Sequence, residues 1–170
     1  MKKINKKVLF TMCGFLLFCV FIAYGIAQCS GGAKDQNKNA STEVNFVPFP
    51  DNLKKYEVPP WEILKLSDFN RSYKKIMGSK IKEYWLKSLG GPSTKNKLIM
   101  TPQGDCVVVH SCMQHNCDTH MILILFNPEN GYCWAMLIEE EKIRWFGQPN
   151  DDIKGLMRKI GKITWPDITP

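Results

Sequence analysis

The sequence predicts an α+β protein with a single, mostly antiparallel, five-stranded sheet of meander type and short helices packed on one side. Five apolar segments of strand length follow one another between residues 97 and 146, and the connections between them are short. Segments with helical spacing of apolar residues stand before and after them. We expect this folded domain to occupy residues 59–170.

The elements are expected in a definite order. Residues 67–77 should form the first helix, because Ser67-Asp68 can cap it and Gly78 ends it. The next segment, 80–86, could be helical or extended. Turn sequences such as Pro102-Gln103-Gly104 then separate the strands, which are expected at 97–101, 105–112, 121–126, 132–138 and 142–146. A last helix opens after Pro149, and residues 163–170 could add an edge segment.

The N-terminal part of the chain predicts export. Four lysines precede an uncharged apolar run over residues 8–27, which is typical of a signal peptide or an N-terminal membrane anchor. The small residues Gly25 and Ala27 favour cleavage before Gln28, whereas Cys29 is a candidate for lipidation. A cleaved signal peptide, an uncleaved anchor and lipidation would each place the rest of the chain outside the cytoplasm, so a periplasmic protein is expected. Residues 28–58 should form a flexible linker.

Charge and composition exclude several classes of function. The whole chain carries +7, and loss of the four N-terminal lysines would leave +3, which does not demand a nucleic-acid partner. The sequence has no Ser/His/Asp arrangement, phosphate loop or paired-carboxylate site. We therefore expect a binding protein without a cofactor rather than an enzyme.

The most unusual stretch is Cys112-Met113-Gln114-His115-Asn116-Cys117, which stands between two predicted strands. Four residues between cysteines suit a disulfide that closes a loop, whereas a thioredoxin-type site needs two. A ring of this size stabilises the fold by roughly 2 kcal/mol. A closed loop also loses less entropy when it enters a cleft. The simplest alternative is a structural disulfide with an incidental histidine.

The remaining cysteines leave two further alternatives open. With His115 and His120, Cys112 and Cys117 offer zinc ligands, but zinc sites usually draw on two ligand pairs that lie farther apart in sequence. We therefore predict no metal. Cys106 and Cys133 lie on predicted strands and are candidates for a second disulfide.

The loop resembles that of the inhibitor of vertebrate lysozyme family, whose hallmark sequence reads C-K-P-H-D-C. Segments around the loop follow the family's order, with a Trp-containing segment at 80–85 and another at 142–147 before the last helix. The resemblance covers roughly residues 65–160. In this chain Met113 and Gln114 replace the family's Lys and Pro, and Asn116 replaces its Asp.

The resemblance implies a function and a mechanism. Family members inhibit c-type lysozyme, and the loop histidine, which corresponds to His115, reaches the two catalytic carboxyl groups of the enzyme. The partner is then a c-type lysozyme or another glycosidase that cleaves peptidoglycan, and the role is evasion of host defence. Members can also pair as homodimers. Two alternatives stay open: a module that controls an endogenous muramidase or lytic transglycosylase, and a non-inhibitory structural or chaperone-like module.

Overall fold

The computed structural model describes residues 43–166, and its centre is one antiparallel sheet. Six strands lie side by side in chain order, so each strand pairs with the next. The strands are β1 (Phe46–Val47), β2 (Lys97–Thr101), β3 (Gly104–Cys112), β4 (His120–Phe126), β5 (Cys133–Glu139) and β6 (Lys142–Phe146). The predicted meander is therefore confirmed, with six strands rather than five.

The extra strand comes from a segment that was predicted to be linker. Phe46 and Val47 pair with Ile99 and Leu98 of β2, and Phe49 and Tyr56 are buried. These apolar side chains are few and spaced by prolines, so they form no periodic pattern that would predict a strand. The folded part therefore begins well before residue 59, and residues 28–42 lie outside the described part of the chain.

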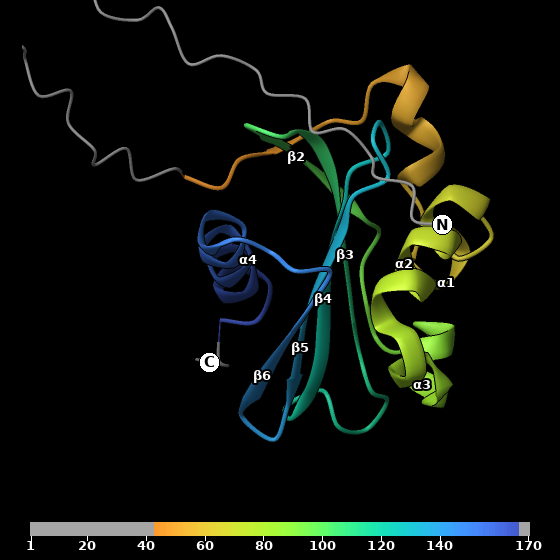
Figure 1. Cartoon of the computed structure of the whole chain (residues 1–170), viewed down its shortest axis with the longest axis vertical. Coiled ribbons are helices and arrows are strands. Elements are labelled where there is room, and N and C mark those ends of the chain that lie inside the picture. Colours follow the sequence, from red (N-terminus) through yellow and green to blue (C-terminus); the bar gives the residue numbers. More distant parts are fainter. Residues whose placement is uncertain (1–42, 167–170) are drawn as a thin grey trace, which may run out of the picture. The chain divides into compact units, whose positions relative to one another are not determined.

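Helices cover both faces of the sheet, which corrects the prediction that they lie on one side (Figure 1). The helical segments between β1 and β2 pack on one face, and the last helix, α4, packs on the other. The helical segments are η1 (Asp51–Tyr56), α1 (Pro60–Ile63), α2 (Ser67–Met77), η2 (Gly78–Lys82), α3 (Tyr84–Ser88) and α4 (Asp151–Thr164). Helices are required on both faces because residues Met121 to Phe126 of β4 are all apolar and buried on both sides of the strand.

Alternation along the strands builds two cores. Side chains such as Val107, Ile124 and Leu137 face α2 and α3, whereas their neighbours Val108, Leu123 and Met136 face α4. On the first face, Phe69 of α2 contacts Phe126 edge-on, with ring centroids 5.4 Å apart. The sheet is thus the middle layer of three, and its ends are free to carry loops.

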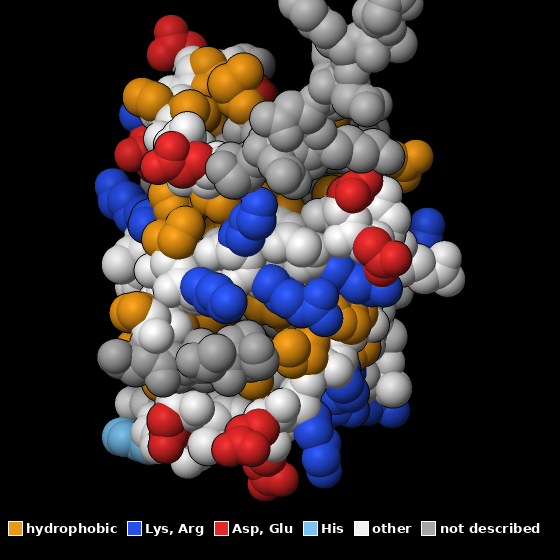
Figure 2. All heavy atoms as spheres, turned by 90° about the vertical axis from the view of Figure 1, so that its left-hand side faces the viewer, with side chains coloured by type: hydrophobic (Ala, Val, Ile, Leu, Met, Phe, Trp, Pro, Cys, Tyr) orange, Lys and Arg blue, Asp and Glu red, His pale blue; other side chains and the backbone are white. Residues whose placement is uncertain are grey.

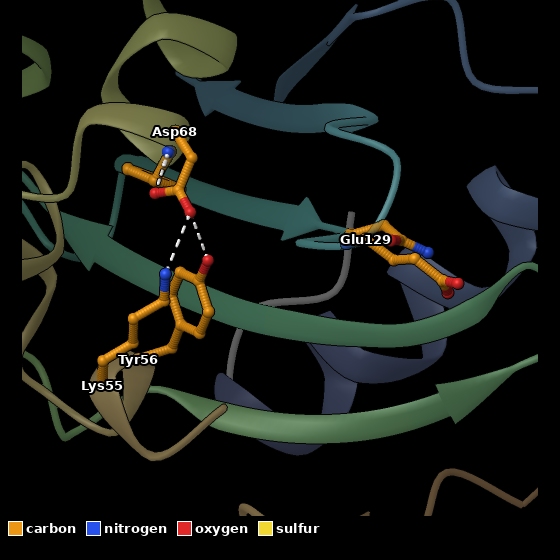
Figure 3. Close-up of polar contacts among 6 residues, drawn as sticks. Lys55, Tyr56, Asp68 and Glu129 are labelled. Carbon is orange, nitrogen blue, oxygen red and sulfur yellow. Dashed lines mark hydrogen bonds and ion pairs between the residues drawn. The ribbon is translucent and has the colours of Figure 1, made fainter. Parts of the chain in front are cut away.

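A polar contact fastens the chain before α2 to the start of that helix. The Tyr56 hydroxyl donates to Asp68, and Lys55 Nζ lies 3.4 Å from the same carboxylate oxygen (Figure 3). The second carboxylate oxygen of Asp68 accepts from the Phe69 amide at 2.8 Å. Partial burial opposes ionisation of Asp68, but these donors outweigh it and hold the pKa of this carboxyl below its ordinary value.

Most predicted elements are confirmed within a residue or two. The first helix ends at Gly78, whose φ is +52°, and the segment left undecided at 80–86 is helical. Asn150 caps α4 by accepting from the Ile153 amide at 2.9 Å. The prediction of an edge segment at 163–170 is wrong for the residues that the structure describes, because α4 continues to Thr164. No helix within residues 43–166 is long and apolar enough to cross a membrane, and the apolar run 8–27 lies outside them.

Candidate inhibitory loop

The loop between β3 and β4 is closed at its base by covalent and hydrogen bonds. Cys112 and Cys117 form a disulfide, with their Cα atoms 4.9 Å apart. Beside it, the Met113 amide donates to the His120 carbonyl oxygen at 2.9 Å. Both thiols that the zinc alternative requires are therefore bonded to each other. The loop is a short covalent ring at one end of the sheet.

His115 lies at the exposed turn of this ring. Gln114, His115 and Asn116 are all exposed, and the Asn116 amide donates to the Met113 carbonyl oxygen at 2.9 Å. The φ angle of His115 is +68°, which is unusual for a residue with a side chain, although histidine tolerates it better than most. The turn thus presents an imidazole to solvent from a defined backbone conformation.

A glycine packs against the base of the ring. A Cβ atom on the buried residue Gly91 would stand 1.6 Å from the Cys112 carbonyl oxygen, so only glycine fits there. Two hydrogen bonds hold the same segment to the end of β3: the Ser111 hydroxyl donates to the Leu89 carbonyl oxygen at 3.2 Å, and Ser93 donates to the His110 carbonyl oxygen. The segment 89–93 therefore supports the loop from beneath.

A groove of about 690 Å³ opens next to the ring. Met113 and Gln114 of the loop form part of its lining, and Trp61 and Tyr84 contribute exposed aromatic side chains. Gly90 and Gly91, where the chain passes the loop base, line it as well. The sequence did not predict this role of the glycine pair, because the approach of two distant backbone segments leaves no local pattern.

Carboxylates gather at the same end of the sheet (Figure 2). The hairpin turn after β5 lies beside the loop, since the Glu140 amide donates to the Thr119 carbonyl oxygen at 2.9 Å. Glu140, Glu141 and Asp118 are exposed and have no ion-pair partner within residues 43–166. The turn at Glu140-Glu141 therefore adds negative charge beside the loop that carries His115.

The other two histidines have neighbours within the fold. His120 Nδ1 lies 2.9 Å from the Thr119 hydroxyl, and its ring meets Trp85 edge-on at 6.4 Å between centroids. His110 is largely buried on the α4 side, where its ring contacts Trp165. Burial, helped by the positive charge of Lys97, lowers the pKa of His110 to about 4. Among the three histidines, His115 has the most open position.

The candidate second disulfide is not formed. Cys106 and Cys133 are free and buried, and they belong to the two opposite cores. Register explains this: Cys133, Phe126 and Val107 share one cross-strand row, and Cys106 is adjacent to Val107 and so faces the other way. Burial raises the pKa of both thiols. Cys29, the candidate for lipidation, lies outside the described residues.

A pocket of about 500 Å³ beside Tyr56 and Asp68 was not predicted. Asp105 and Glu129 also line it, and Figure 3 places Glu129 away from the bonded trio of Lys55, Tyr56 and Asp68. No group of three or more metal-binding side chains occurs within residues 43–166. The carboxylate of Asp68 is already bonded to Lys55 and Tyr56, so we assign these three residues to the contact that joins η1 to α2.

Comparison with known proteins assigns the chain to a family. The family model described as inhibitor of vertebrate lysozyme (Ivy) matches residues 68–167, which is more than half of the chain. The match includes the whole disulfide ring and the acidic hairpin beside it. A search of curated proteins finds no match.

Proposed function

Because this chain belongs to the inhibitor of vertebrate lysozyme family, we propose that it blocks a c-type lysozyme by inserting His115 between the enzyme's two catalytic carboxyl groups. The family consists of inhibitors, not enzymes. One observation carries the proposed mechanism: an exposed imidazole stands at the turn of a disulfide-closed loop.

The chemistry of the two partners is complementary. A lysozyme keeps one catalytic carboxyl protonated as a general acid and the other ionised. A neutral imidazole accepts a hydrogen bond at one nitrogen and donates at the other, so His115 can satisfy both groups. If the ring takes up the proton, its bond to the carboxylate becomes charge-assisted and stronger. The covalent ring supports this because a loop that is already ordered loses less entropy on binding.

The charge around the loop favours a basic target. The mature chain carries about +3 if residues 1–27 are removed, which alone would disfavour a basic lysozyme. Glu140, Glu141 and Asp118 make the neighbourhood of His115 negative, although Lys142 offsets one of these charges. Local charges next to the contact steer association more strongly than distant ones, since salt screens charges beyond about 8–10 Å.

The proposal includes export to the periplasm, where the chain would meet a lysozyme that enters from outside. An endogenous muramidase or lytic transglycosylase is the second candidate target, because Met113, Gln114 and Asn116 differ from the family's loop sequence. Fractionation of cells followed by the mass of the mature N-terminus tests the location. A cytoplasmic chain with residues 1–27 intact would contradict export.

The mechanism is tested by inhibition of cell-wall hydrolysis with a matched set of loop variants. His115→Ala alone would mix loss of the ring with strain, because alanine does not favour a φ of +68°. His115→Asn is the sharper variant, since asparagine tolerates this conformation but lacks the imidazole. We expect it to weaken inhibition by about a hundredfold, as for a central interface residue.

The control is Asn116→Asp, which restores the family's residue next to an intact imidazole and should keep inhibition. Both variants should unfold at the wild-type temperature. Full inhibition by His115→Asn would exclude the proposed role of the ring. If the wild-type protein inhibits a lytic transglycosylase but no c-type lysozyme, the target is the second candidate and not the proposed one.

A further inference from the structure

The groove next to the disulfide ring is continuous with the proposed contact surface. Met113 and Gln114 belong to both, so a protein that contacts these two loop residues also lies beside the groove. Its volume of about 690 Å³ is large enough for one or two side chains of a partner. The question is which chemistry the groove would accept.

Aromatic side chains form one part of the groove. Tyr84 is 83% exposed and Trp61 is 42% exposed, and neither side chain makes a hydrogen bond within residues 43–166. Residues of these two types are the ones that most often dominate protein interfaces. Two exposed aromatic side chains around one groove, next to the loop, are typical of a protein interface, because a side chain that only stabilises the fold is usually buried.

Carboxylates form another part. Glu83 and Glu139 line the groove, whereas their cationic partners Lys80 and Arg144 do not. Lys80 Nζ lies 2.9 Å from Glu139 and also contacts Glu83, and Arg144 contacts Glu139, so two cations balance the two carboxylates from outside the lining of the groove. The lining itself carries aromatic faces and carboxylate groups but no lysine or arginine, and this combination favours a cationic group.

We propose that this groove receives a basic side chain, arginine or lysine, from the rim of the target's active-site cleft, next to the place where the loop enters. This inference rests on the proposed function, since the same lysozyme must bind the loop. The aromatic rings of Trp61 and Tyr84 pack against the stem and head of the basic side chain, and Glu83 accepts from its nitrogen atoms. The groove thus adds a second contact region and selects basic targets.

The test measures the dissociation constant for a basic c-type lysozyme by titration calorimetry. Tyr84→Ala and Trp61→Ala should each raise Kd by about tenfold. Glu83→Gln should raise it by severalfold and reduce its dependence on salt, because a rim charge acts through screened attraction. The same Glu83→Gln change should have no effect on a lysozyme variant in which the contacting arginine or lysine is replaced by alanine.

Tyr132→Ala is the matched control, because Tyr132 is 59% exposed but lines a different pocket. It should leave Kd within twofold of the wild type. Tyr84 is so exposed that its variant should keep the wild-type unfolding temperature, and it carries the test even if Trp61→Ala fails to fold.

The outcomes separate the two proposals. Wild-type affinity of Tyr84→Ala and Glu83→Gln, combined with loss of binding in His115→Asn, would overturn the groove inference and leave the proposed function standing. Failure of the wild-type protein to bind any lysozyme would overturn the proposed function, and the groove inference with it.

Discussion

Replacement of Gly91 by alanine should displace the inhibitory loop although none of the loop's own residues is changed. The new Cβ atom would lie 1.6 Å from the carbonyl oxygen of Cys112 and 2.8 Å from its carbonyl carbon. To reach an ordinary contact of 3.4 Å, the two backbone segments must separate by about 1.8 Å. Overpacking of this kind costs about 1–3 kcal/mol of folding stability.

The functional effect should exceed the effect on stability. A binding site must be held within about 0.5 Å of its productive geometry, and the expected shift is several times larger. Inhibition should therefore weaken by at least tenfold even at temperatures where the variant is fully folded. The assay is the inhibition constant against cell-wall hydrolysis, measured together with the free energy of unfolding from urea denaturation.

A glycine on the other face of the sheet provides the control. A Cβ on Gly155 of α4 would meet nothing within 4 Å, so Gly155→Ala should leave inhibition unchanged and, because the residue lies inside a helix, should not lower stability. Gly91→Ala that inhibits as strongly as Gly155→Ala would refute the argument that the segment 89–93 positions the loop.

Two further predictions concern stability. Removing the disulfide by Cys112→Ser with Cys117→Ser should lower the free energy of unfolding by about 2 kcal/mol in urea denaturation, because the closed ring limits the unfolded chain; an unchanged midpoint would contradict this. Between pH 6.5 and about 4, acidification should destabilise the domain, since the unfolded state binds a proton at His110 that the folded state refuses. The loss should be on the order of 2–3 kcal/mol. Comparison of urea midpoints across this pH range should show a smaller loss in His110→Gln, and an equal loss would show that other groups cause it.

The local elements could be predicted because each depends on neighbouring residues. The run from Met121 to Phe126 is apolar throughout, and it forms the central strand β4 as expected. Ser67 to Gly78 carries both helical spacing and an end signal, and α2 occupies it. The spacing of Cys112 and Cys117 predicts the ring because four intervening residues suit a disulfide that closes a loop, whereas a thioredoxin-type site needs two.

The contacts between distant segments could not be predicted. Phe46 and Val47 join the sheet through a pairing with Leu98 and Ile99 that spans about fifty residues of chain. Cys106 and Cys133 both lie on strands, and only the register shows that they face opposite cores. A sequence pattern reports what repeats nearby, whereas register and pairing depend on the whole sheet.

By itself, the sequence determined the strands, the main helices and the disulfide ring that carries His115, and through the ring the family. These features depend on periodicity and spacing, which are properties of a continuous stretch of chain. Only the tertiary structure decided that helices cover both faces, that Gly91 supports the ring, and that Trp61 and Tyr84 share a groove with Met113. The physical reason is that such contacts join residues far apart along the chain, where packing and charge are set by the completed fold.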